Sequence, residues 1–251
     1  MKLSGAKGTG RTYSAAKPEE DGYGKDALDE LPEDLPVPTD DGATDHLPGM
    51  RLPFVPLIST VGNVVDLESF DGRTVVYCYP LTGRPGRSLP QGWDEIPGAR
   101  GCTPQSCAFR DYHEDIQSLG APVYGLSTQD TEYQREAAER LHLPFELLSD
   151  EDLIFAKALS LPTFEAEDMS LLKRLTLIVF EGRIEKVFYP VFPPNKNAKE
   201  VFEWLSQNPL GVSPSQTAQK KVFYYAGCRT GKSPTREPSK RRWLCETIEA
   251  G

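Results

Sequence analysis

Residues 74–80 read TVVYCYP, and residues 102–111 read CTPQSCAFRD. The first stretch is a compact run of β-branched and aromatic residues, which is typical of a buried strand, and Pro80 ends it. The second stretch begins like a helix, with Thr103 as a candidate N-cap and Pro104 at the first helical position. A buried strand followed by a loop and a helix that starts with a cysteine predicts an α/β domain with its functional site at the end of that strand.

Further strands and helices alternate along the chain on either side of this unit. The patterns predict strands over residues 63–67, 122–127, 145–148, 172–180 and 183–189, turns at Asp71-Gly72 and Glu181-Gly182, and helices over residues 102–119, 131–141, 152–159 and 197–206. Such alternation, followed by a hairpin and a closing helix, predicts a mixed central sheet flanked by helices. The order is that of the thioredoxin-like α/β fold.

The two ends of the chain differ from its middle in composition. Residues 1–45 are rich in Gly, Pro, Asp and Glu without any period, and we expect a disordered acidic extension, with a loosely packed arm as the alternative. Residues 46–210 are expected to form the domain. Residues 211–251 are basic and rich in Ser, Pro and Thr, and they are expected to be a disordered tail, with binding to an anionic surface as the alternative. Neither flank is expected to take part in the chemistry.

Composition narrows the class of protein. A net charge of -9 argues against a general nucleic-acid binder, because such a protein needs Lys and Arg to neutralise phosphates. No apolar run approaches the ~18 residues of a membrane span, and the N-terminus lacks the apolar segment of a secretory signal. Five cysteines are an odd number for a disulfide-stapled scaffold. We therefore expect a cytoplasmic protein of a reducing compartment, a monomer or weak dimer, without nucleic-acid or membrane partners.

The cysteine pair of the predicted helix is the strongest chemical signal. The positive end of a helix favours a thiolate, so Cys102 has a physical reason to be ionised and reactive. Cys107 follows five residues later, a rise of ~7.5 Å along a helix, and its side chain points away from that of Cys102. The two thiols could form a disulfide only if the first helical turn unwound. The alternative for Cys107 is a small buried core residue.

Several motifs around this pair occur in the order of one known family. The sequence resembles the bacterioferritin-comigratory, or peroxiredoxin Q, branch of the peroxiredoxins over about residues 48–207, on the following stretches: Gly101-Cys102-Thr103, Cys107-x-Phe109-Arg110-Asp111, Leu126-Ser127, Pro144-Phe145, Leu148-Ser149-Asp150 and Arg174-Leu175-Thr176-Leu177-Ile178. The resemblance implies a peroxidatic Cys102, a resolving Cys107 and an active-site Arg174. It implies thiol-dependent reduction of hydrogen peroxide and organic hydroperoxides, recycling by a thioredoxin-like donor, and no cofactor.

The loop before Cys102 departs from the family pattern Pro-x-x-x-Thr-x-x-Cys. Pro80 ends the strand as in the family, but Cys102 follows twenty-two positions later, and Ala99 stands three residues before it in place of threonine. The loop over residues 81–101 therefore carries an insertion. We take Pro80 as a substrate-binding residue, with Thr82 and Thr103 as the candidates for the missing hydroxyl.

The chemistry requires more than a thiolate. Lowering the pKa of a thiol also lowers its nucleophilicity, so fast peroxide reduction needs donors that stabilise the stretched O–O bond. Arg174 can supply a fixed fork of donors, and its alternative role is a salt bridge at a strand start.

Two other functions use the same residues. One is a one-cysteine peroxidase in which Cys107 is only core, and the other is a redox sensor that passes its disulfide to a partner protein.

Cys78 is expected to be inert core, and Cys228 and Cys245 are expected to be free thiols of the tail. The scattered histidines, His46, His113 and His142, predict no metal site.

Overall fold

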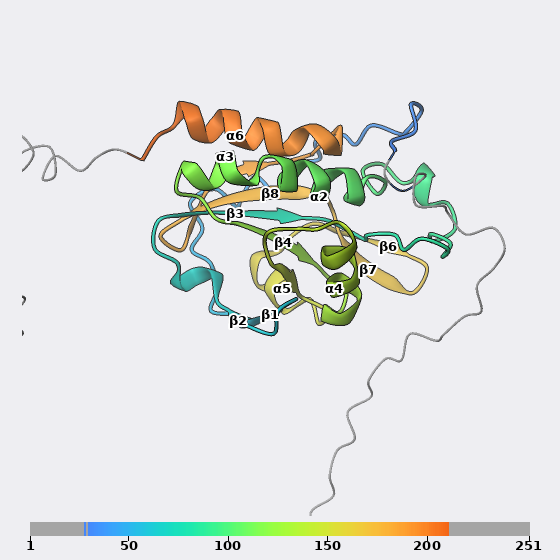
Figure 1. The fold of residues 1–251 in the computed structure, drawn as a ribbon, viewed down its shortest axis with the longest axis horizontal. Helices are drawn as coiled ribbons and strands as arrows, with labels where there is room; N and C mark the ends of the chain where they lie inside the picture. Colours follow the sequence, from blue (N-terminus) through green and yellow to red (C-terminus); the bar gives the residue numbers. More distant parts are fainter. Residues whose placement is uncertain (1–27, 29, 211–251) are drawn as a thin grey trace, which may run out of the picture. The chain divides into compact units, whose positions relative to one another are not determined.

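A computed structural model of the chain describes residue 28 and residues 30–210. A mixed sheet of seven strands runs in the order β2-β1-β5-β4-β3-β8-β9, and β6 and β7 form a second, two-stranded sheet (Figure 1). The strands are β1 (Leu57–Ser59), β2 (Val64–Val65), β3 (Arg73–Cys78), β4 (Val123–Ser127), β5 (Leu147–Ser149), β6 (Thr163–Ala166), β7 (Met169–Leu172), β8 (Leu175–Phe180) and β9 (Arg183–Phe188). The helices are α2 (Cys102–Asp111), α3 (His113–Ser118), α4 (Thr131–Arg140), α5 (Ile154–Leu159) and α6 (Asn197–Gln207).

This arrangement confirms the predicted thioredoxin-like α/β fold. Strands β3, β4 and β5 are parallel, and the antiparallel strands β8 and β9 continue the sheet beyond β3. In the β3–β8 ladder, the last residue of β3, Cys78, pairs with the first residue of β8, Leu175. Arg174, just before β8, is therefore held beside the end of β3, where the loop to Cys102 departs.

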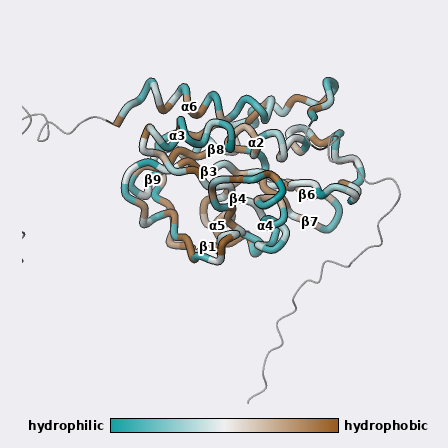
Figure 2. The backbone as a smooth tube through the Cα atoms, viewed as in Figure 1, coloured by the Kyte–Doolittle hydropathy of each residue, from teal (hydrophilic) through white to brown (hydrophobic). Residues whose placement is uncertain are grey.

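The core lies on both faces of the central strands. Side chains of β3 such as Tyr77 pack against Phe109 of α2, Ile116 of α3 and Val201 of α6 on one face. On the other face, residues such as Val76 pack against Phe155 of α5. Figure 1 shows α2, α3 and α6 together on one side of β3 and β8, and Figure 2 shows the tube coloured hydrophobic along these central strands. The face that carries α2 and α6 is the one that holds Cys102.

The predicted helix over residues 102–119 is in fact two helices. Tyr112, with φ −94° and ψ 4°, separates α2 from α3. The N-cap is Gly101 in a left-handed conformation, so Thr103 is an internal residue of the first turn and not the cap. Gly120, with φ +77°, follows α3 as expected for a helix stop.

The remaining differences concern short strands. β1, β6 and β7 were not expected from the sequence, because they span three or four residues each and show little alternation. The Asp71-Gly72 turn leads into β3 but does not form a hairpin, since β4 and β8 are the only partners of β3 among the described strands. The Glu181-Gly182 turn between β8 and β9 is confirmed. Among the described residues, no helix is long and apolar enough to cross a membrane.

Residue 28 and residues 30–45, the described part of the N-terminal segment, pack onto the domain as an arm, so for these residues the expected disordered extension is wrong. Leu28 is buried, and Asp41 accepts hydrogen bonds from Lys173 Nζ and Tyr189 Oη, both at 2.7 Å. Composition missed this arm because its few contact residues follow no helical or strand period. Residues 1–27, 29 and 211–251, with Cys228 and Cys245, lie outside the described residues.

Candidate active site

Cys102 is the first residue of α2 and is buried, with 3% of its surface exposed. Gly101 precedes it with φ +101°, a conformation that side chains rarely adopt. A Cβ at Gly101 would lie 2.7 Å from Leu31 Cδ2 and would also overlap Pro194. A glycine is therefore required both to turn the chain into α2 and to let the N-terminal arm and the segment before α6 close over the cysteine.

Arg174 is the charged group nearest to the thiol in the hydrogen-bond network. Its Nη2 donates to Cys102 Sγ at 3.2 Å, and the same sulfur lies 3.6 Å from the carbonyl oxygen of Ala99. A guanidinium at hydrogen-bond distance from sulfur offers further donors for an oxygen bound next to that sulfur. The structure thus brings together two of the predicted site residues, which lie far apart in sequence.

The inserted loop supplies the other partners of Arg174. Its Nε and Nη2 donate to the carbonyl oxygens of Gly98 (3.3 Å), Ala99 (2.9 Å) and Arg100 (3.1 Å). Its Nη1 donates to Gln105 Oε1. The end of the inserted loop therefore contributes backbone carbonyls that fix the plane of the guanidinium. Sequence reasoning missed Gln105, although its position three residues after Cys102 on one helix could have indicated it.

Cys107 lies further along α2 and is half-buried, and neither it nor Cys102 forms a disulfide. The pKa of the Arg110 guanidinium is raised mainly by its hydrogen bond to Asp111, and Cys107 is a smaller contributor to the same shift. The two sulfurs are thus held apart by the intact helix, as its geometry requires.

Thr82 is buried, but its amide and hydroxyl donate to Gln129. Thr82 N and Oγ1 donate to Gln129 Oε1 at 2.9 and 3.0 Å. Pro80, which ends β3, accepts a hydrogen bond from Ser127 Oγ at 3.1 Å. Thr103 is buried in the first turn of α2, next to Cys102. Of the two candidate hydroxyls, only that of Thr103 belongs to the cysteine's own helical turn.

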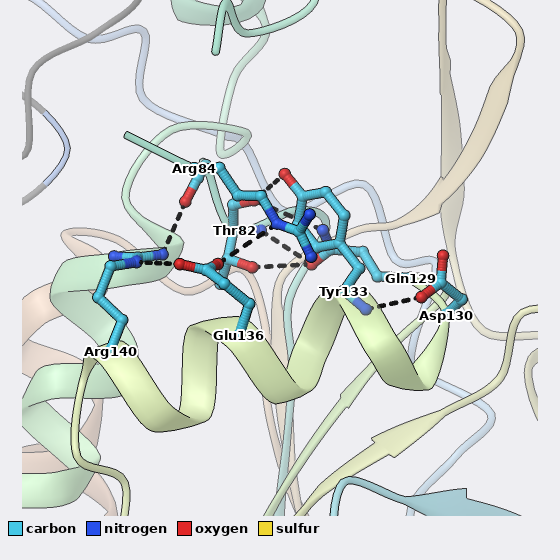
Figure 3. A network of polar contacts seen from close by, with 8 residues as sticks. Thr82, Arg84, Gln129, Asp130, Tyr133, Glu136 and Arg140 are labelled. Carbon is cyan, nitrogen blue, oxygen red and sulfur yellow. Dashed lines mark hydrogen bonds and ion pairs between the residues drawn. The ribbon is translucent and has the colours of Figure 1, made fainter. Parts of the chain in front are cut away.

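The network drawn in Figure 3 ties the start of the inserted loop to α4. Tyr133 Oη donates to the Thr82 carbonyl at 3.0 Å, and the Arg84 guanidinium lies over the Tyr133 ring at 3.9 Å from its centroid. Arg140 donates to the Gly83 carbonyl at 2.9 Å and to Glu136 at 2.7 Å. These contacts anchor the insertion at the end opposite to the carbonyls that hold Arg174.

A cavity of about 310 Å³ opens beside Arg174. Its lining comes from the N-terminal arm, the inserted loop, β6 and the chain after β9, and it includes Pro38, Ile96, Phe164, Lys173 and Val191. The wall is thus largely apolar, and its charged lining residues are the paired Asp41 and Lys173 and the guanidinium of Arg174.

Cys78 is completely buried on β3, and burial raises the pKa of its thiol, which keeps it protonated and unreactive. Within residues 30–210, no group of three or more His, Cys, Asp or Glu side chains is placed to hold a metal ion.

Comparison with known proteins gives one consistent result. The sequence model of the family described as Redoxin matches residues 44–202. Peroxiredoxin Q of Oryza sativa subsp. japonica, a chloroplastic protein, is 34% identical over 161 residues, which cover 62% of this chain and 65% of the rice protein. Peroxiredoxin Bcp of Bacillus subtilis is 31% identical over 143 residues, which cover 55% of this chain and 82% of that protein.

Solved structures share the fold. The peroxidoxin BcpB of Mycobacterium tuberculosis superposes with a TM-score of 0.52 at 22% identity, over 64% of this chain and 98% of that protein. A cysteine-to-serine mutant of Xylella fastidiosa PrxQ gives the same TM-score at 21% identity, over 65% of this chain and 98% of its own.

Proposed function

This chain belongs to the Redoxin family, in its peroxiredoxin Q and Bcp branch, and from that premise we propose that it is a thiol peroxidase whose nucleophile is Cys102. The observation that carries the proposal is the 3.2 Å hydrogen bond from Arg174 to the sulfur of a cysteine at a helix start. Peroxide reduction uses the sulfur as a thiolate, and the Arg174 guanidinium supplies donors that can hold both this sulfur and a peroxide oxygen.

In the first step, the Cys102 thiolate attacks the terminal oxygen of the hydroperoxide. The S–O bond forms as the O–O bond breaks, the sulfur is oxidised to a sulfenic acid, and the alkoxide takes a proton and leaves as the alcohol, or as water from hydrogen peroxide. Arg174 is the donor that stabilises the charge developing on the two oxygens, with Pro80 and Thr103 beside the substrate. The Thr82 hydroxyl would have to leave Gln129 to take part.

In the second step, the Cys107 thiolate attacks the sulfenic sulfur, and a Cys102–Cys107 disulfide forms with release of water. Because the two residues lie five positions apart on α2, the first turns of that helix must unwind for their sulfurs to meet. A thioredoxin-like dithiol then reduces the disulfide and is itself oxidised. This recycling assigns the protein to a reducing compartment.

The cavity beside Arg174 supports a wider substrate range than hydrogen peroxide. Cys102 itself is almost inaccessible, so a substrate must approach through the groups around it. A partly apolar space that borders Arg174 suits the hydrocarbon part of an organic hydroperoxide. The catalytic arginine would then receive the polar end of the substrate and the cavity its apolar end.

A coupled assay with thioredoxin, thioredoxin reductase and NADPH tests the proposal. The wild-type protein should consume hydrogen peroxide and an organic hydroperoxide catalytically, and Cys102→Ser should be inactive. Cys107→Ser should reduce one equivalent of peroxide and then stop, because its sulfenic acid has no resolving thiol. Continued turnover by Cys107→Ser would make this a one-cysteine peroxidase, and substantial turnover by Cys102→Ser would exclude the assigned nucleophile.

A further inference from the structure

A buried chain of hydrogen bonds continues from Arg174 to the start of α6. Gln105 accepts from Arg174 with its Oε1, and its Nε2 donates to Asn197 Oδ1 at 3.0 Å. Thr176 Oγ1 donates to the same Asn197 oxygen at 2.7 Å. Gln105, Thr176 and Asn197 are each fully buried. These hydrogen bonds thus link α2, the second residue of β8 and the first residue of α6 to the guanidinium that contacts Cys102.

Arg174 determines which atom donates and which accepts in each of these hydrogen bonds. An arginine has donors only, so Gln105 has to present its oxygen to Arg174 and its NH₂ group to Asn197. Asn197 in turn has to present its oxygen, and its Nδ2 is left buried without a hydrogen-bond partner among the described residues. Such a donor lowers stability, and buried amides are usually satisfied. The Asn197 amide is therefore oriented so that its oxygen supports the Gln105 contact with Arg174, and this orientation leaves the Asn197 Nδ2 without a partner among the described residues.

We propose that Asn197 is a positioning residue for the peroxidatic site: its side-chain oxygen fixes the Gln105 amide, which holds the Arg174 guanidinium against the Cys102 sulfur. The inference rests on the thiol peroxidase function proposed above. Without that oxygen, the Gln105 amide has no acceptor for its NH₂ group and no reason to keep its oxygen toward Arg174. The guanidinium then loses a partner in its own plane, and its donor to sulfur is no longer held at hydrogen-bond distance.

The test uses the reduced full-length protein. One readout is the rate at which iodoacetamide alkylates Cys102 at pH 7, followed by mass spectrometry of the Cys102 peptide, and the other is kcat/KM for hydrogen peroxide. Asn197→Leu should lower both by about tenfold, the order expected when one charge-assisted hydrogen bond is misaligned. Asn197→Asp keeps an acceptor oxygen for Gln105 and Thr176 and should stay within about threefold of wild type.

The matched control is Thr74→Val. Thr74 is also buried, and its hydroxyl has no hydrogen-bond partner among the described residues, but it lies on β3 outside this chain of contacts. Its replacement should change neither alkylation nor kcat/KM.

A double-mutant cycle separates positioning from general stability. In a Gln105→Met background the link to Arg174 is already broken, so adding Asn197→Leu should have no further effect on either readout. Additive losses would overturn the proposal. So would an Asn197→Leu protein with a lower Tm but wild-type alkylation and kcat/KM. If Asn197→Leu does not fold, Asn197→Ser, whose hydroxyl is too short to reach Gln105, takes its place under the same criteria.

The alkylation readout keeps this inference apart from the proposed function. If Asn197→Leu slows alkylation while the wild-type protein consumes no peroxide, the positioning role stands and the peroxidase function fails. If peroxide is consumed and alkylation does not respond to Asn197, the reverse holds.

Discussion

The guanidinium of Arg174 donates to the sulfur of Cys102 at 3.2 Å, although 72 positions separate the two residues in the sequence. The same guanidinium donates to three successive carbonyls of the inserted loop, at residues 98–100, and to Gln105. The arginine is therefore both a partner of the thiol and the centre around which the loop is folded. A flat group with donors along two edges is needed to reach all of these acceptors at once.

Arg174→Lys should therefore damage the enzyme even though the charge is kept. A lysine ammonium can reach only some of these acceptors and cannot hold sulfur and peroxide in one plane, so we expect kcat/KM for peroxide to fall by about 10²-fold. Arg73→Lys is the matched control, because Arg73 is also buried and forms a bidentate pair with Glu185 at 2.7 Å, yet it lies at the start of β3. That control should lower Tm without changing kcat/KM. Full activity of Arg174→Lys at pH 7 would contradict the requirement for a planar donor.

The sequence predicted the parts of the fold that rest on long apolar patterns. Residues 74–79 and 175–180 are almost wholly apolar, aromatic or β-branched, and they supply all of the central strands β3 and β8 except Arg73. The strand predicted over residues 172–180 begins only at Leu175, because Leu172 is the last residue of β7. The pairing of these two strands brought Arg174 to Cys102, as the family motifs implied. The break at Tyr112 was not predicted, because the apolar pattern continues through it from Phe109 to Ile116.

Contacts of the irregular segments could not be read from the sequence. Thr82 is one of the two candidates that the sequence offers for the missing active-site hydroxyl, but in the fold its Oγ1 donates to Gln129. Asp41 stands in an acidic stretch that suggested disorder, and only the folded chain shows Lys173 within reach. Such long-range pairs follow no local period, so propensity and pattern carry no signal for them.

Gly101→Ala should disturb the start of α2 and the site with it. The added methyl group would overlap Leu31 and Pro194, in a backbone conformation that L-residues rarely adopt. We expect Cys102 to be displaced from Arg174 and peroxide turnover to fall by about tenfold or more. Gly120→Ala is the control, because Gly120 also has a positive φ of +77° but a Cβ there meets nothing within 4 Å. It should cost about 1 kcal/mol of stability and leave turnover unchanged. Equal turnover of the two variants would argue against close packing at Gly101.

Asp41→Asn should loosen the N-terminal arm over a defined pH range. The hydrogen bond from Lys173 is the main cause of the lowered pKa of Asp41, and Asp41 is in turn the main cause of the raised pKa of Lys173. The contribution of Asp41 to stability is therefore present above the usual carboxyl pKa and is lost as the pH falls through its lowered folded value. The contribution of Lys173 to stability is complete below the usual amine pKa and is lost as the pH rises through the raised pKa of the folded state.

The difference in Tm between wild type and Asp41→Asn should thus be constant from about pH 5 to about pH 9 and shrink outside that range. The neighbouring Asp40→Asn, which removes one exposed charge but keeps an oxygen that can accept the hydrogen bond from Gly42 N, should give a smaller difference throughout. If the Tm difference changes with pH in a titration centred near neutrality, another group controls the attachment of the arm.

Oxidation should open α2 without opening α3. A Cys102–Cys107 disulfide requires the loss of the first helical bond, from Gln105 N to the Gly101 carbonyl at 3.0 Å, and of the Tyr77–Ser106 hydrogen bond at 3.1 Å. Phe109, fully buried and stacked on Tyr77 with ring centroids 4.4 Å apart, resists further opening. The unwound segment should therefore end before Phe109. The break at Tyr112 should keep the opening from spreading into α3.

Amide hydrogen exchange of the reduced and oxidised proteins measures this opening directly. Residues 102–108 should lose protection on oxidation, because terminal helical turns open at a small fraction of the global unfolding free energy, while residues 113–118 keep theirs. Cys107→Ser treated with one equivalent of peroxide is the control, since its sulfenic acid can form without any need to unwind the helix. Equal protection of residues 102–108 in both forms, with mass spectrometry showing a complete Cys102–Cys107 bond, would exclude the unwinding step. A bond from Cys102 to Cys78, Cys228 or Cys245 would instead assign the resolving role to another thiol, and α2 would then have no reason to open.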